Sequence, residues 1–342
     1  MLNEGLDGAL DHSSGLVGAD GADNGADEVA SRLASRDFDY FGGAPCFTPE
    51  IDLACQQVSN WTRCDNPGAF IHGLQRLGKS WCGRYIHQAV PMILGRSTIS
   101  VLWSAVDFKQ SKSEFLRDRL RQVKHPGFNH TRESVLSQRL LDHLVGLAGV
   151  SGATRILMIF DEAQKLAEAH YHQIAALTDA LVFENIRPFV LQIGQPDLST
   201  HMDHFETKNS MQLTGRFFPV SHEYMGIAIE DIADVLKEMD GPEGSSVIER
   251  FFPERAARNF QLSHAAQPMR EALESLAAVK LLDGDIRLPM QYLRGAMSTL
   301  LYKLNASEGH KVVVDSQLMK ICLEEVGFPK VMKLYSVPLG QA

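Results

Sequence analysis

The sequence predicts an α/β fold, with a parallel sheet and surrounding helices, followed by an all-α part. Up to Met225, short apolar segments alternate with amphipathic helical patterns, which is typical of the strands and crossover helices of a parallel sheet. A glycine-rich turn joins the first apolar segment to a helical pattern. Beyond Met225 the strand-like segments stop and only helical patterns follow. The pattern therefore places a sheet-based unit before a helical one.

The composition is that of a globular chain with about two compact units. Of the 342 residues, 44% are hydrophobic and 22% are charged, so the chain can bury an ordinary core. No apolar segment approaches the ~18 residues of a membrane span, and the N-terminus lacks the basic start of a signal peptide. The five cysteines include no C-x-x-C pair, which argues against a disulfide framework and a zinc site. We therefore expect a cytoplasmic protein without a membrane partner.

The net charge of −9 is concentrated at the N-terminus. Residues 1–30 hold seven acidic residues and no Lys or Arg, whereas the rest of the chain carries 33 basic and 35 acidic residues. Because Gly, Ala, Asp, Ser and Asn dominate this region, residues 1–42 are expected to form an acidic disordered tail. The remaining chain is close to neutral, so its charge does not exclude binding to nucleic acid.

The local pattern sets the expected elements and the division of the chain. Thr48, Pro49 and Glu50 form a helix start, because a capping hydroxyl, a first-turn proline and an acid suit an N-terminus. Strands are expected within residues 66–72, 98–104, 155–160, 189–193 and 217–220. Helices are expected at 49–61, 112–123, 133–148, 171–185 and 198–206, then at 228–239, 246–258, 266–282 and 288–304. The expected units are an α/β domain at 43–225, a helical domain at 226–310, and a C-terminal helix and tail at 311–342.

The clearest motif is the glycine-rich turn, which matches G-x-x-x-x-G-K-[ST] from Gly73 to Ser80. Glycines allow backbone N–H groups to surround phosphates, and the helix that follows presents its positive end to them. Lys79 is expected to neutralise the β- and γ-phosphates, and the Ser80 hydroxyl to bind Mg²⁺. The residues predicted to bind ATP are Gly73, Leu74, Gln75, Arg76, Leu77, Gly78, Lys79 and Ser80. The motif indicates a P-loop NTPase.

A second strand supplies the carboxylates that such a site needs. The apolar run Ile156–Phe160 ends in Asp161 and Glu162, and Asp161 stands 82 residues after Lys79. Asp161 is expected to bind the hydrated Mg²⁺ together with Ser80, and Glu162 to polarise the attacking water.

Further side chains are candidates for contact near the γ-phosphate. Gln195 follows the strand at 189–193 and is the first choice for the polar group that orients the water, with Gln192 as the reserve. If neither acts there, both are amides satisfied locally. Arg216 is expected to act as an arginine finger on the nucleotide of a neighbouring subunit, and Arg270 to fold over the nucleotide with the helical domain. The alternatives are an ordinary surface arginine and a solvated helix face.

In this order, the motifs resemble those of an AAA+ ATPase with a helical lid. More narrowly, Gly73–Lys79, Asp161–Gln164, Ile193–Leu198 and Gly215–Phe217 are similar to the TnsC/TniB regulators of DNA transposition. The resemblance covers residues 45–285. Secretion-type ATPases of related sequence share the D-E-A-Q and G-Q-P-x-L segments.

The resemblance implies an ATP-loaded protein that assembles head to tail into rings or helical filaments on duplex DNA, marks the target site and recruits the transposase. Its hydrolysis of ATP to ADP and phosphate would be slow, stimulated by a partner or by DNA, and would drive disassembly. The implied partners are double-stranded DNA held by its backbone, further copies of the chain, transposase subunits and a target-recognition factor, for which an RNA-guided complex is one candidate. A secretion or envelope-assembly ATPase and a nucleotide-gated adaptor with negligible hydrolysis are the alternatives.

A basic run supplies a candidate DNA surface. Residues 109–134 carry seven basic residues against three acidic ones, and such bases bind backbone phosphates without reading sequence. The residues expected to contact DNA are Lys109, Lys112, Arg117, Arg121 and Lys124. The alternative is a solvated helix face, and a single helix face cannot present every base of the run.

Overall fold

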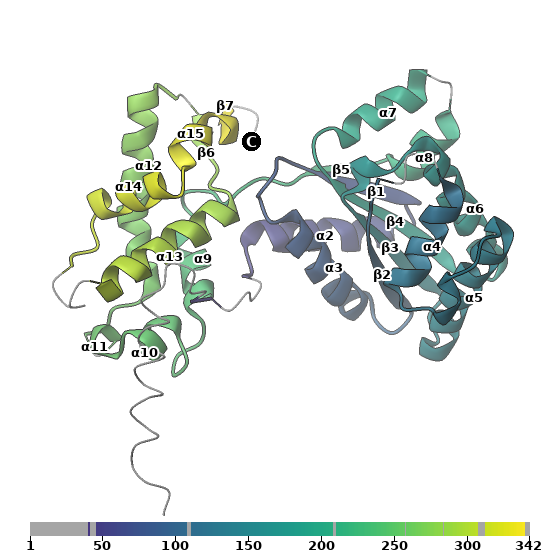
Figure 1. Cartoon of the computed structure of the whole chain (residues 1–342), viewed down its shortest axis with the longest axis horizontal. Coiled ribbons are helices and arrows are strands. Elements are labelled where there is room, and N and C mark those ends of the chain that lie inside the picture. Colours follow the sequence, from purple (N-terminus) through teal and green to yellow (C-terminus); the bar gives the residue numbers. More distant parts are fainter. Residues whose placement is uncertain are drawn as a thin grey trace, which may run out of the picture.

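The computed structural model describes residues 40–41, 46–107, 111–207, 210–256, 258–282, 284–306 and 312–338. An α/β part and a helical part lie side by side, joined by the segment that follows the fifth strand (Figure 1). The predicted acidic tail lies outside the described residues, apart from Tyr40 and Phe41. None of the described helices is long and apolar enough to cross a bilayer.

Five parallel strands form the sheet of the α/β part. They are β1 (Gly68–His72), β2 (Thr98–Ser104), β3 (Arg155–Asp161), β4 (Arg187–Gly194) and β5 (Ser221–Glu223), in the order β2-β3-β4-β1-β5. Asp161 lies opposite Ile193, and His72 lies opposite Gly194. Because all strands run the same way, the P-loop after β1, Asp161 at the end of β3 and Gln195 after β4 meet at one edge of the sheet. That edge is where open α/β sheets bind their ligands.

Helices cover both faces of the sheet (Figure 1). One face carries α2 (Pro49–Arg63) and α3 (Lys79–Leu94), and the other carries α4 (Lys112–Gln122), α5 (Glu133–Ser151), α6 (Glu168–Phe183), α7 (Leu198–Thr207) and α8 (Met211–Phe217). The alternation along β3 shows why the strand is apolar throughout. Leu157 and Ile159 are buried under the first group of helices, and Ile156, Met158 and Phe160 under the second.

The predicted strand at 217–220 is wrong, because residues 211–217 form α8 and the fifth strand begins at Ser221. Leu213 and Phe217 are four residues apart and are both buried, so they form the inner face of a helix turn. The Phe217 ring packs 5.2 Å from the ring of Tyr171. As a result, Arg216 is the last residue but one of a helix.

The helical part consists mainly of helices, of which α12 (Ala266–Lys280) and α13 (Met290–Ala306) are the longest. It also contains α9 (Ile232–Asp240), α10 (Val247–Phe251), α11 (Pro253–Ala256), η3 (Leu262–Ala265) and β6 (Gly284–Ile286). Pro253 starts α11, so the single helix predicted at 246–258 is divided in two. We refer to residues 226–306 as the lid.

The C-terminal segment packs into the lid, although the sequence suggests a helix and a tail apart from it. This segment contains α14 (Ser316–Glu325), α15 (Phe328–Val331), η4 (Met332–Tyr335) and β7 (Ser336–Pro338). α14 lies against α12 and α13, and Met319, Cys322 and Leu323 are fully buried there. β7 pairs antiparallel with β6, a pairing that the sequence pattern does not predict. The Tyr335 hydroxyl donates a hydrogen bond to the carbonyl oxygen of Gln75 at 3.0 Å, so the segment also contacts the P-loop.

Replacing Phe328 by Ala is expected to lower the free energy of unfolding by about 3–5 kcal/mol. Phe328 is fully buried, and its ring lies 5.3 Å from that of Tyr292 in the lid, so truncation leaves a cavity between the two. Thermal unfolding followed by circular dichroism measures the effect. Leu334→Ala is the matched control, because Leu334 is 65% exposed and its truncation should change stability by less than about 0.5 kcal/mol. Equal melting temperatures for the two variants would contradict the packing described for this segment.

Candidate functional site

The P-loop turns between β1 and α3 in a conformation that depends on glycine. Gly78 has a φ of 108°, which a side chain would oppose, and Arg76, within the same loop, has a φ of 65°. A Cβ atom at Gly73 would lie only 2.3 Å from the carbonyl oxygen of Tyr224, in the segment that leads to the lid. The Tyr224 backbone therefore requires glycine at position 73, independently of any phosphate bound by the loop.

Lys79 is folded back onto its own loop. Its ammonium donates hydrogen bonds to the carbonyl oxygens of Gly73, at 2.7 Å, and of Leu74. Burial lowers the pKa of Lys79 to about 8, although Glu162 and Asp161 act to raise it. A half-buried ammonium held by neutral carbonyl acceptors is prepared to exchange them for phosphate oxygens.

We expect ATP to bind more weakly above pH 8, because the ammonium form of Lys79 binds phosphate. The free side chain loses its proton near pH 8, at its pKa. In the complex, the ATP phosphates keep Lys79 protonated. Above pH 8, binding of ATP therefore requires Lys79 to take up a proton, and the affinity for ATP falls by up to about tenfold per pH unit. Calorimetric titrations in buffers of different ionisation heat measure the uptake. Lys79→Ala should lose nucleotide binding. An affinity of the unaltered protein that stays constant up to about pH 9.5 would contradict the role of this ammonium.

Ser80 and Asp161 form the candidate metal site. The Ser80 hydroxyl donates a hydrogen bond to the Asp161 carboxylate, and the Glu162 N–H donates to Asp161 Oδ1 at 2.9 Å. Burial raises the pKa of Asp161, while these two hydrogen bonds lower it in part. A hydroxyl and a carboxylate in contact are oxygen donors of the kind that Mg²⁺ prefers, so the residues fit this ion. When bound, Mg²⁺ would neutralise charge on the phosphate oxygens.

Glu162 is held at the cavity by an unusual backbone conformation. Its φ of 58° lies in the left-handed region, which costs a non-glycine residue about 1–2 kcal/mol. Its Oε2 atom accepts a hydrogen bond from Gln164 Nε2 at 3.1 Å and pairs with Lys165 Nζ at 3.0 Å. The side chain is thereby oriented, and it lines the same cavity as Lys79. These features suit a carboxylate that must face a water beside the γ-phosphate.

Gln195 faces the P-loop across the cavity, whereas Gln192 does not reach it. Gln195 Oε1 accepts a hydrogen bond from Gln75 Nε2 at 3.0 Å, and its backbone N–H donates to Gln164 Oε1 at 3.2 Å. Gln192 is fully buried in the sheet. Gln164, which the sequence analysis did not single out, contacts both Glu162 and Gln195. Its place in the D-E-A-Q segment, two residues after Glu162, was the available signal.

A cavity of about 700 Å³ lies between the P-loop and helix α13 of the lid. Met290, Gln291 and Arg294 of α13 form the wall opposite Lys79. The two parts are also bonded directly, because Arg76 Nη1 donates to the Tyr292 hydroxyl at 2.7 Å. The cavity is therefore lined by residues of both the α/β part and the lid.

The structure does not bring Arg270 to this cavity. Arg270 is a half-buried residue of α12, and the arginine that the lid places at the cavity is Arg294 on α13. Both helices belong to the lid and both carry an arginine in their first half, so the sequence alone could not choose between them. In the structure, α13 and not α12 forms the wall that faces the P-loop.

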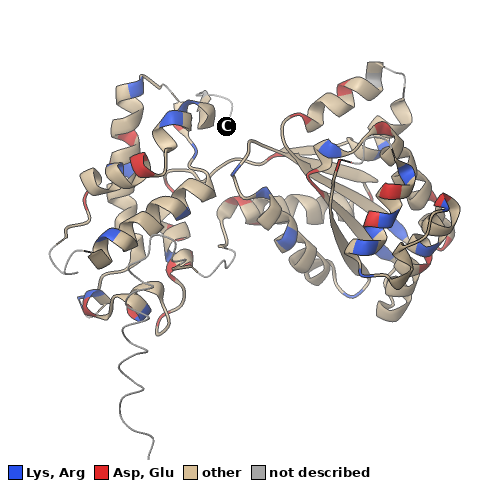
Figure 2. Cartoon of the chain, in the orientation of Figure 1, with Lys and Arg blue, Asp and Glu red and all other residues tan. Residues whose placement is uncertain are grey.

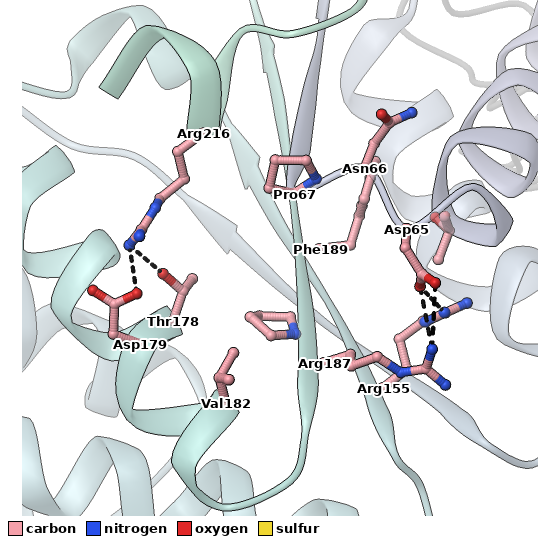
Figure 3. Close-up of a pocket in the computed structure, with 12 residues that line it drawn as sticks. Asp65, Asn66, Pro67, Arg155, Thr178, Asp179, Val182, Arg187, Phe189 and Arg216 are labelled. Carbon is pink, nitrogen blue, oxygen red and sulfur yellow. Dashed lines mark hydrogen bonds and ion pairs between the residues drawn. The ribbon is translucent and has the colours of Figure 1, made fainter. Parts of the chain in front are cut away.

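Arg216 lies at the opposite edge of the sheet, beside the first residues of β4 (Figure 3). Its Nη1 atom donates to the Ala175 carbonyl oxygen at 3.0 Å and to Thr178 Oγ1 at 3.2 Å, and it pairs with Asp179 Oδ1 at 2.9 Å. A cavity of about 230 Å³ adjoins these groups. The five residues of β1 separate this edge from the P-loop by about 17 Å. Arg216 therefore cannot serve the nucleotide of its own subunit.

The candidate DNA residues do not form one basic face. Lys109 lies outside the described residues. Lys112 begins α4, and about two and a half helical turns separate it from Arg121, so these two project from opposite sides. Arg117 and Arg121 are four residues apart and share a face, and Lys124 is exposed beyond the end of the helix. Basic and acidic positions are mixed over this part of the molecule (Figure 2).

Part of the charge of the basic run is used inside the protein. Arg119 is 1% exposed, donates to the Ser104 carbonyl oxygen at 2.9 Å and pairs with Asp118 at 2.6 Å. Arg121 lies 3.7 Å from the same Asp118 carboxylate. The run thus presents fewer uncompensated charges to solvent than its sequence suggests.

The chain has a P-loop AAA+ fold with a helical C-terminal region, so the predicted fold class is confirmed. Residues 66–202 match the family described as AAA domain. No curated protein sequence matches the chain.

Among solved structures, the chain is similar to Drosophila ORC bound to DNA, at 10% identity, with 95% of this chain and 72% of that chain covered and a TM-score of 0.50. It is similar to Cdc6p from Pyrobaculum aerophilum at 14% identity, over 81% and 66% of the two chains with a TM-score of 0.45. A Walker-type ATPase of Pyrococcus abyssi shares 13% identity over 86% and 77%, with a TM-score of 0.48. At such low identity the similarity concerns the fold.

Proposed function

We propose that this protein is an ATPase that binds Mg²⁺-ATP between its P-loop and its lid. One observation carries the proposal: side chains from the carboxyl ends of three strands converge on one cavity beside Lys79. Ser80 and Asp161 supply oxygen ligands for the metal, and Glu162 and Gln195 flank the cavity where a water would attack. Phosphoryl transfer depends mainly on such positioning and on electrostatic stabilisation.

The second part of the proposal is head-to-tail assembly. Arg216 stands on the edge of the sheet opposite the P-loop, so it can complete the site of a neighbouring subunit and not its own. A contact between these two different edges is heterologous, and repeating it gives a ring or an open helix. Hydrolysis would then be slow in single subunits and faster in the assembly.

The finer proposal is that the assembly forms on duplex DNA and regulates transposition. Support comes first from the sequence. The P-loop and the D-E-A-Q, G-Q-P-x-L and G-R-F segments resemble those of TnsC/TniB regulators. In addition, Drosophila ORC, a protein of the same fold, is described as bound to DNA. The protein would mark a target site for transposase subunits, after a target-recognition factor or an RNA-guided complex, and hydrolysis would drive its release. Arg117, Arg121 and Lys124 remain the proposed phosphate contacts. Lys112, on the opposite side of α4 from Arg121, and Lys109, which lies outside the described residues, are further candidates.

The test is ATP-dependent binding to random-sequence duplex DNA, imaged by negative-stain microscopy at two salt concentrations with ADP as the control. Rings or filaments that need both ATP and DNA, and that weaken steeply with salt, are expected. The double variant Arg117→Ala, Arg121→Ala should reduce the salt dependence, and Lys330→Ala, Lys333→Ala, which removes two exposed bases of the C-terminal segment, should not. Absence of DNA binding in both nucleotide states would leave the ATPase and favour the secretion-type alternative. Absence of turnover under every condition would favour the nucleotide-gated adaptor.

A further inference from the structure

Gln192 is a buried amide at a place where the sheet is otherwise apolar. It is fully buried on β4, opposite Phe160 of β3 on one side and Phe70 of β1 on the other. A polar side chain in such surroundings is costly unless both ends of its amide are bonded. An apolar residue would fill this position at lower cost, so the bonds of Gln192 indicate what it is for.

Both ends of the amide are bonded, and each bond holds an element that surrounds Arg216. Gln192 Nε2 donates to the carbonyl oxygen of Phe217 at 2.7 Å, and Phe217 directly follows Arg216 in α8. Gln192 Oε1 accepts from the Tyr171 hydroxyl at 2.6 Å, and Tyr171 belongs to α6. α6 also provides Ala175, which binds the Arg216 guanidinium. One amide thus fixes the backbone that carries Arg216 and the helix that orients its side chain.

The backbone of α8 is also held from the side of β1. A Cβ atom at Gly68 would lie 2.6 Å from the carbonyl oxygen of Arg216, so the helix end rests directly on the start of the strand. Gln192 bonds the next carbonyl group along, that of Phe217. The end of α8 is therefore clamped by main-chain packing and by one side-chain hydrogen bond.

We infer that Gln192 is a positioning residue for Arg216. By holding the end of α8 and helix α6, Gln192 places the Arg216 guanidinium where it can reach the nucleotide of the next subunit. The inference rests on the proposed role of Arg216 in a neighbouring site. Gln192 does not line the cavity beside Lys79, but it is only three residues from Gln195, which does. An effect through Arg216 must therefore be separated from an effect on the cavity of its own subunit. A mixing experiment makes this separation, because each subunit uses its own Glu162 and its neighbour's Arg216.

The experiment measures phosphate release by equal mixtures of variants, with ATP and duplex DNA present. Arg216→Ala lacks the finger and Glu162→Gln lacks the water-activating group, so each alone should be inactive. Mixed, they should regain roughly a quarter of the wild-type rate, since that share of head-to-tail contacts joins an intact finger to an intact site. If this pair stays inactive, Arg216 does not act across subunits, and that part of the proposed function and the present inference both fail.

Gln192→Met retains the volume of the side chain and removes both hydrogen bonds. Alone, it should bind ATP normally and lose about 100-fold in turnover, as expected for an ångström-scale misplacement. Mixed with Glu162→Gln, which supplies a well-placed finger, it should recover to the level of the control pair. Mixed with Arg216→Ala, it should not recover, because neither variant offers a working finger.

Gln195→Met is the matched control from the same strand end and should behave in the opposite way. Its finger is intact, so it should rescue Arg216→Ala, and its own site is defective, so Glu162→Gln should not rescue it. If Gln192→Met follows this second pattern, or recovers with neither partner, the positioning role is wrong. Should Gln192→Met fold poorly, Tyr171→Phe removes a single hydroxyl from the same network and is expected to give the Gln192 pattern at smaller amplitude.

Discussion

Replacing Glu162 by Gln is expected to lower ATP turnover by about 100- to 10,000-fold while ATP stays bound. The substitution exchanges one oxygen for a nitrogen, so the volume at the end of β3 is unchanged, but the amide cannot accept the proton of the attacking water. Lys79, Ser80 and Asp161 remain as they are, and they are the groups proposed to hold the nucleotide and its metal.

The same substitution should preserve the ATP-bound assembly. If hydrolysis drives release, a subunit that binds ATP without cleaving it remains in the form that assembles, and mass action keeps the oligomer populated. Phosphate release measures the loss of turnover, and size-exclusion chromatography with ATP and DNA measures the persistence of the oligomer. Glu184→Gln is the control, because it makes the same chemical change at an exposed glutamate at the end of α6. Full turnover by the Glu162→Gln protein would remove the water-activating role from this residue.

The sheet and its edge could be predicted because they depend on local patterns. Five consecutive apolar residues in β3 require burial on both faces, and this requirement alone places helices on both sides of the sheet. The P-loop comes directly after one strand in the sequence, and Asp161 is the last residue of another. Parallel strands bring their carboxyl ends to one edge, so the sequence also predicted that these groups would meet.

The choices that the sequence could not make depend on which way a side chain or a helix faces in the tertiary structure. Gln192 and Gln195 are both amides near the end of one strand, and only the complete burial of Gln192 in the folded sheet shows that it belongs to the core. Arg270 and Arg294 both lie on lid helices, and only the position of α13 beside the P-loop shows that Arg294 lines the cavity.

For a similar reason, the packing of the C-terminal segment into the lid could not be predicted from the sequence. Its strand is three residues long, and it exists because β6 lies beside it, about fifty residues earlier in the chain. Short strands of this kind carry little pattern of their own, since their stability comes from the partner strand and from the packing around them.

If Arg216 acts as the proposed arginine finger, replacing it by Ala is expected to lower the ATPase rate of the assembled protein by about 1000-fold or more. ATP affinity should be unchanged, because Arg216 lies at the edge of the sheet opposite its own P-loop. The three contacts that the structure describes for this guanidinium all use Nη1, which leaves Nη2 and Nε to meet an incoming phosphate. Arg216→Lys should restore little activity, because an ammonium cannot make the paired contact of a guanidinium.

The dependence of the ATPase rate on protein concentration distinguishes a role of Arg216 in the neighbouring site from a structural role within its own subunit. The wild-type rate per subunit should rise with concentration as neighbours bring Arg216 to each site, whereas the Arg216→Ala protein should stay at the level of single subunits at every concentration. Asp179→Asn is the matched control, since it removes the ion pair but retains the contacts of Arg216 with Ala175 and Thr178. Partly exposed pairs of this kind contribute only about 0–1 kcal/mol, so its turnover should remain within about fivefold of wild type. If both variants lose activity equally, the ion pair and not the transfer of Arg216 to a neighbouring phosphate would account for the effect.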